Sequence, residues 1–107
     1  MADTPKHLGS TTSTTAVNLY DNGATGYTVI HSIIICNTSA NTAYTYNISK
    51  STTSGTHELY LVSAATVNPN DSIVMQMAQV LDSSCRYLVV NASNAAVRIT
   101  ASGVIGP

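Results

Sequence analysis

The sequence predicts an all-β protein, an antiparallel β-sandwich (Ig-like or jelly-roll-like) of about seven to eight short strands, from three observations. Segments that alternate apolar and polar residues recur along the chain, with turn residues about every 8–12 positions. Helix bundles are disfavoured because only 8% of the residues are charged. A chain of 107 residues without an evident linker suits one core.

The start of the chain differs from the rest. Residues 1–15 have no apolar period, so we expect an extended N-terminal arm there and a single sandwich domain over residues 16–107. A run of hydroxyl residues buries little apolar area, which leaves two interpretations, a frayed terminus or an arm that orders on a neighbouring subunit. The candidate partner-contact residues are Ser10, Thr11, Thr12, Ser13, Thr14 and Thr15.

The first half of the domain contains the strongest strand signals. Ala16–Tyr20 alternates and is followed by a turn at Asp21–Gly23, where Asn-Gly suits positive φ. Tyr27–Cys36 alternates at first and then becomes apolar on both faces, which predicts a central strand covered on both sides. After a polar turn at Asn37–Asn41, Ala43–Lys50 alternates again.

The second half continues the pattern with shorter segments. The remaining expected strands are His57–Val62, Ser72–Met77, Cys85–Ala92 and Ala96–Ala101, and the loops and turns between them are Ser51–Thr56, Asn68–Asp71 and Asp82–Ser84. One alternative stays open. A short helix over Val74–Leu81 would place Val74, Met77 and Leu81 on one face.

Composition and charge exclude several classes of function. The net charge of −1 comes with no basic cluster, so direct nucleic-acid binding is not expected. No apolar run approaches the roughly 18 residues of a membrane span, and Met1–Ser10 does not resemble a secretory signal. Without an export signal, Cys36 and Cys85 are predicted to be buried thiols rather than a disulfide.

The groups that could perform catalysis are few. His7 is expected to be solvated, and His31 is expected to be a hydrogen-bonded core residue. His57 and adjacent Glu58 begin a strand with their side chains on opposite faces, which does not build an acid–base pair, so His57 is expected to be a solvated loop end. Zinc-ligand spacing, a calcium loop and a glycine-rich phosphate loop are missing from the sequence. We therefore expect no enzyme, no metal site and no cofactor.

Tyrosine is the aromatic residue of this chain, which has six Tyr and neither Phe nor Trp. A Tyr ring with its polar tip suits a ligand-binding surface, and it equally suits the rim of a small core. The candidate surface-binding residues are Tyr44, Tyr46 and Tyr60.

Several segments together resemble a known group of proteins. These are Thr28–Ala40 (Thr-Val-Ile-His-Ser-Ile-Ile-Ile-Cys-Asn-Thr-Ser-Ala), Tyr60–Val62, Asn68–Asn70, Tyr87–Ala92 and Val97–Ala101. In these motifs, residues 17–105 resemble the small β-sandwich virion proteins of tailed bacteriophages. The chain departs from their pattern at Asp82–Cys85, where relatives often carry Gly-Asp.

The resemblance implies a structural role in a virion assembled in the host cytoplasm. The leading expectation is a capsid decoration (cement) protein that bridges major capsid subunits as a homo-oligomer, with a trimer favoured. A neck or tail adaptor, or a fibre-associated module that binds host sugars, is the alternative. The chain has 15 Thr, 13 Ser and 9 Asn, and a surface rich in hydroxyls and amides favours contacts that salt does not weaken.

Overall fold

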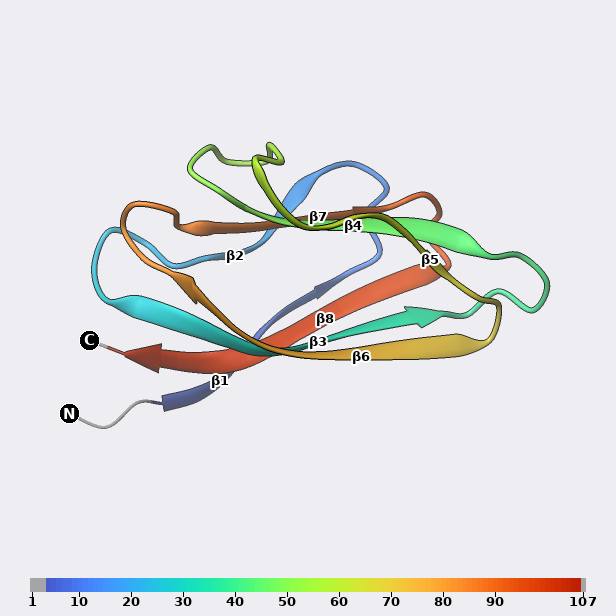
Figure 1. Cartoon of the computed structure of the whole chain (residues 1–107), viewed down its shortest axis with the longest axis horizontal. Helices are drawn as coiled ribbons and strands as arrows, with labels where there is room; N and C mark the ends of the chain where they lie inside the picture. The colour runs from blue at the N-terminus through green and yellow to red at the C-terminus, as the bar shows by residue number, and fades with distance from the viewer. Residues whose placement is uncertain (1–3, 107) are drawn as a thin grey trace.

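The computed structural model describes residues 4–106 as two antiparallel sheets of four strands packed face to face (Figure 1). Sheet A has the order β1 (Thr4–Thr11), β8 (Val97–Gly106), β3 (Tyr27–Asn37), β6 (Asp71–Leu81). Sheet B has the order β2 (Val17–Asp21), β7 (Tyr87–Ala92), β4 (Tyr44–Ser51), β5 (Leu59–Val67). The predicted β-sandwich is confirmed. The described residues contain no helix, and Val74–Leu81 belongs to β6. None of the described residues therefore forms a helix that could span a membrane.

The core lies between the two sheets and is filled by aliphatic side chains. Ile30, Ile33 and Ile35 of β3 are fully buried, and they meet residues such as Ile48 and Leu88 from sheet B. Full burial of one such side chain stabilises the fold by about 1.5–3 kcal/mol. The inward positions of the alternating segments therefore supply the main stabilising surface.

The position of β3 is only partly as predicted. The strand is central, because it pairs with β8 on one side and with β6 on the other. Its outer face is not covered, however, and Ile34 is 42% exposed. A sandwich has two layers, so each sheet can bury only one face.

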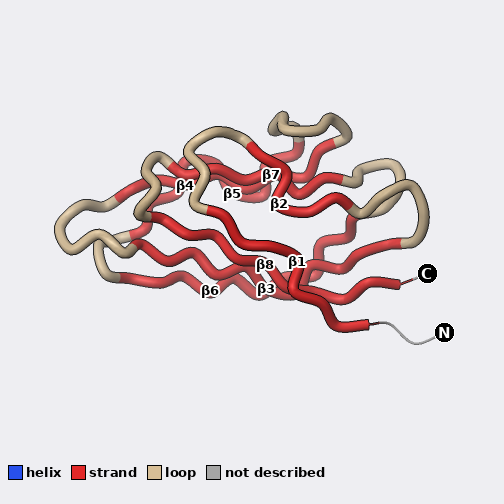
Figure 2. The backbone as a smooth tube through the Cα atoms, turned by 180° about the vertical axis from the view of Figure 1, so that it is seen from behind, coloured by secondary structure: helices blue, strands red, loops and turns tan. Residues whose placement is uncertain are grey.

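Residues 4–11 of the expected N-terminal arm form β1, which pairs with β8 along its length (Figure 2). Leu8 is buried in the core, and the hydroxyl groups of Ser10 and Thr100 lie 3.0 Å apart. In the connection to β2, the carbonyl of Ser13 accepts a hydrogen bond from the Ala92 amide. An edge strand gains main-chain hydrogen bonds with few apolar side chains, so this polar segment is built into the sandwich. Residues 1–3 of the arm lie outside the described residues.

Candidate interaction surface

The outer face of sheet A is an open surface with few charges. Its side chains form one cross-strand row of Ser10, Thr100, Ile34 and Val74, and another of Val104, Val29 and Val80. Val74 is 61% exposed and Val80 is 44% exposed. The charged residue Arg98 lies beside the first row and donates a hydrogen bond to Ser10. This face therefore combines exposed aliphatic groups with hydroxyls.

Backbone irregularities bend sheet A at one level across three of its strands. β1 is irregular between His7 and Gly9, and β3 is irregular between Ile30 and Ser32. In the β3–β6 register, Met77 and Ala78 face the single residue His31. Such bulges bend a strand and redirect the side chains beside them.

A shallow depression lies at this level, lined by Lys6, His7, His31, Ser102, Gly103 and Val104. His31 is exposed here, so its prediction as a core residue is wrong. The bulge shifts the alternation of β3 by one position, so the inward residue that follows Ile30 is Ile33. His7 is exposed. No group of three or more metal-ligating side chains occurs in the described residues.

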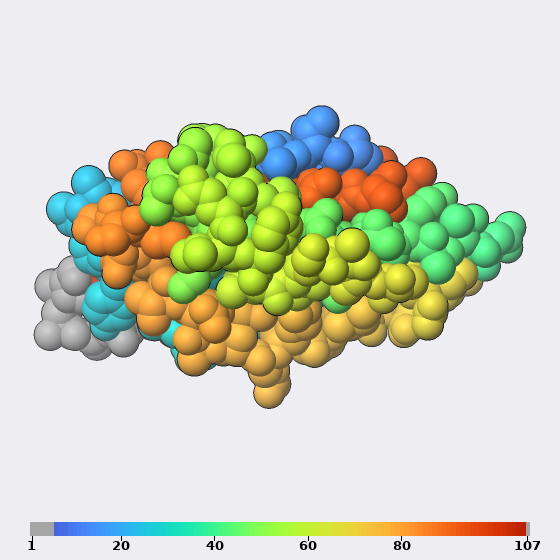
Figure 3. Space-filling model, turned by 45° about the horizontal axis from the view of Figure 1, so that its top comes forward, coloured from blue at the N-terminus to red at the C-terminus, as the bar shows by residue number. Residues whose placement is uncertain are grey.

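Exposed apolar side chains also gather on one side of the sandwich, where the edge strands β5 and β6 meet. Leu59 and Tyr60 of β5 are 57% and 52% exposed, and Val74 and Val80 belong to β6. Figure 3 shows β5 (yellow-green) and β6 (yellow to orange) side by side on the molecular surface. Sequence reasoning missed this side, because alternation identifies a strand without showing whether it lies at an edge.

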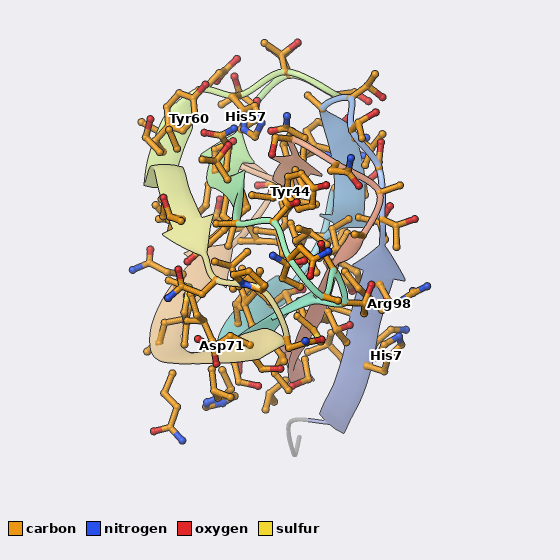
Figure 4. The ribbon with its side chains drawn as sticks, turned by 90° about the vertical axis from the view of Figure 1, so that its right-hand side faces the viewer. His7, Tyr44, His57, Tyr60, Asp71 and Arg98 are labelled. Atoms are coloured by element: carbon orange, nitrogen blue, oxygen red, sulfur yellow. The ribbon has the colours of Figure 1, made fainter. Side chains whose placement is uncertain are left out.

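The three candidate tyrosines do not share a surface. Tyr46 is only 3% exposed and faces the core, and its burial raises the pKa of its hydroxyl above the ordinary value. Tyr44 is half-buried and packs against the same core. Tyr60 is exposed near His57, at a distance from Tyr44 (Figure 4). Of the three, Tyr60 is the exposed one.

His57 is not the solvated loop end that the sequence suggests. Its Nε2 lies 2.8 Å from Asn91 Oδ1, and its Nδ1 lies 2.6 Å from the hydroxyl of Ser49. Because an amide oxygen only accepts, Nε2 donates to Asn91, and in the neutral ring Nδ1 then accepts from Ser49. Asn91 Oδ1 also accepts from Asn47 Nδ2, and Asn47 Oδ1 accepts from the Ala64 amide.

This network fastens the loop between β4 and β5 to the outer face of sheet B. Ser49 is fully buried beneath the loop, so no substrate reaches its hydroxyl and the Ser–His–Asn trio holds the loop in place. Asn18 adds two contacts, accepting from the Gly55 amide and donating to Ser54. Hydrogen bonds from Thr53 and Thr52 hold the pKa of the Glu58 carboxyl below its ordinary value. The contacts span far-separated positions, so no local sequence signal marks them.

The two cysteines are free and half-buried. Cys36 lies on β3, and Cys85 forms an isolated bridge with Asp82 in the turn after β6. The predicted thiols are therefore present, with less burial than expected.

Comparisons with family models, with curated proteins and with solved structures give no match for this chain.

Proposed function

We propose that this chain is a structural protein of a bacteriophage virion, most specifically a capsid decoration protein that binds a larger protein shell through the outer face of sheet A. The motif resemblance supports the virion setting. The binding surface is inferred from the outer face of sheet A, where exposed Ile34, Val74 and Val80 lie next to hydroxyl groups.

The chemistry of this face suits a protein partner. Burial of exposed aliphatic groups supplies the driving force for association, at about 25 cal/mol per Å² of apolar area. Hydroxyl side chains such as Ser10 and Thr100 add hydrogen bonds that depend on geometry rather than on net charge. Binding of this kind weakens little with rising salt, because few charges take part.

The test is the occupancy of the chain on shells that lack it. Ile34→Lys places a charge in the middle of the outer face of sheet A, at a side chain that is already 42% exposed. The matched control, Thr66→Lys, adds the same charge at an exposed position of β5 in sheet B. We expect wild type and T66K to bind in co-sedimentation and I34K to lose binding, with unchanged circular dichroism.

An electron-microscopy map of the bound particles then separates the virion positions. Copies spread over the head support a decoration protein, and a single ring at the portal or tail supports an adaptor instead. Equal binding of I34K and wild type contradicts the assigned face. Failure of the wild-type chain to join any virion contradicts the virion role.

A second candidate function, a host-binding module of a fibre, is favoured by one observation. The Tyr60 ring is exposed and stacks on His57, with ring centroids 5.0 Å apart and an interplanar angle of 21°. His57 is itself held by Ser49 and Asn91, so this aromatic pair is a rigid platform of the kind on which sugar rings stack. Glycan-array binding that Tyr60→Ala abolishes, with no binding to shells, would support this candidate over the first.

A further inference from the structure

The edge strand β6 differs from the other three edges of the sandwich. β1 contains Pro5, Lys6 and a bulge at Leu8, and β2 has only five residues. β5 is irregular in its pairing and contains Ala64 with φ of 51°. Prolines, lysines, bulges and short length are the usual devices that stop an edge from pairing with another chain. β6 has 11 residues with no Pro, Gly, Lys or Arg, and its one bulge lies at Met77–Ala78.

We propose that β6 is the pairing surface for a second copy of this chain, which adds its own β6 in the antiparallel direction. The two copies of sheet A then form one continuous sheet across a two-fold axis. Pairing satisfies the open main-chain groups of both edges and covers apolar side chains such as Val74, the most exposed of the large hydrophobics at 61%.

The charges at the ends of β6 identify a second copy as the occupant. Asp71 begins the strand, and its carboxylate accepts a hydrogen bond from the amide of adjacent Ser72. Near the other end, the ammonium of Lys50 lies 3.4 Å from the carbonyl oxygen of Val80. Among residues 4–106 the one ion pair joins Arg86 and Asp21, so within this part of the chain neither Asp71 nor Lys50 has an opposite charge in contact.

In an antiparallel pair, the Asp71 end of each copy meets the Lys50 end of the other copy, so the dimer contains two such contacts. Each Asp71 then lies next to the Lys50 end of the other copy, whereas a parallel arrangement would place like charges together. In a chain with only four basic and five acidic residues, this complementarity favours a second copy over an unrelated peptide strand. The proposal rests on the edge and its charges, and it does not depend on the proposed function.

The side-chain alternation of β6 limits the register, and pairing over the full strand, residues 71–81, places the axis at the central residue. Residues directly opposite in an antiparallel pair point to the same face, so even-numbered outer residues must face even-numbered ones. An axis at Gln76 meets this condition and pairs Ser72 with Val80 of the other copy. Asp71 then lies opposite Leu81, beside the Val80 carbonyl that contacts Lys50. The bulge at Met77–Ala78 lies next to this axis, where it increases the local twist.

The first experiment measures oligomeric state by sedimentation equilibrium. We expect a dimer for wild type, a monomer for Val74→Lys and a dimer for the matched control Thr66→Lys, all with native circular dichroism. Val74 is exposed, so the lysine is tolerated in the monomer, and its charge opposes pairing of the edge. A wild-type monomer at the highest attainable concentration, a trimer, or a dimer that V74K leaves intact would overturn the proposal.

Charge exchange tests the antiparallel direction. Asp71→Lys and Lys50→Glu each create two like-charge contacts in a homodimer. These contacts should raise the dissociation constant of the dimer about tenfold. Mixed one to one, the two variants restore both attractive contacts, and native mass spectrometry should show the heterodimer in excess over either homodimer. A statistical mixture would contradict the assigned ends.

Disulfide cross-linking tests the register. In a background with Cys36→Ser and Cys85→Ser, Gln76→Cys places two thiols at the axis, within the range of about 4.4–6.8 Å between Cα atoms that a disulfide needs. We expect Q76C to cross-link on mild oxidation and the matched control Ser72→Cys to remain uncross-linked. The reverse result would overturn this register. Shell binding by D71K, measured at a concentration where its dimer has dissociated, would leave the proposed function standing when the dimer is lost, because Asp71 lies at the end of β6 and not among the exposed aliphatic residues of the outer face.

Discussion

The contact between β3 and β8 at Gly103 allows a sharp prediction about stability. A Cβ atom added at Gly103 would lie 2.1 Å from the carbonyl oxygen of Val29, and the next two neighbours are also backbone atoms. No side chain can rotate away, so Gly103→Ala must separate two paired strands by roughly 1 Å in the middle of sheet A. Overpacking of this kind costs typically about 1–3 kcal/mol, and rigid backbone neighbours place G103A at the upper end.

We expect G103A to lower the free energy of unfolding by about 2–3 kcal/mol, and hence the melting temperature by about 10–20 °C. Urea unfolding followed by circular dichroism measures the first quantity and a thermal scan the second. Gly23→Ala is the control, because Gly23 has φ of 86° and no atom within 4 Å of the added Cβ. G23A should cost about 1 kcal/mol, from backbone strain alone. Equal stabilities of G103A and wild type would refute the steric reasoning.

Two further predictions concern polar contacts. Asn91→Ala leaves the Nε2–H of His57 and the Nδ2 of Asn47 without their shared acceptor, so it should cost about 1–3 kcal/mol and speed amide exchange in the loop of residues 52–58, as seen by mass spectrometry. Asp21 has its pKa lowered by the hydrogen bond from Arg86, so its contribution to stability is present above the ordinary pKa near 3.8 and is lost as the pH falls through the lowered value. Asp21→Asn should therefore be less stable than wild type at neutral pH by under about 1 kcal/mol, and equally stable at the acid end of a pH series of urea titrations.

The alternation of apolar residues was enough to predict most strands. Tyr27–Cys36, Ala43–Lys50 and Cys85–Ala92 all overlap strands of the structure, because their inward positions form the core. β1 was not predicted, because Leu8 is its one buried apolar residue and its pairing comes from the main chain. His31 was assigned to the wrong environment, because a bulge inside a strand leaves no clear mark in the sequence.

The candidate site was predicted less well than the fold, and for a related reason. Period-two alternation placed Tyr44, Tyr46 and Ile48 on one face, but only the pairing of the sheets shows that this face is the inner one. Tyr60 is exposed because β5 is an edge strand. The network around His57 joins β4, the following loop and β7, so it depends on contacts that arise only after the sheets form.

The pairing of β1 with β8 has a mechanical consequence. Thr4 lies opposite Ile105, so the two ends of the chain leave the molecule at the same end of one antiparallel ladder (Figure 1). Tension applied between the termini would load that ladder in the unzipping geometry, so its hydrogen bonds would break one after another rather than all at once. We therefore expect the sandwich to yield at low pulling force from its termini, and to resist better when it is held through internal surface positions.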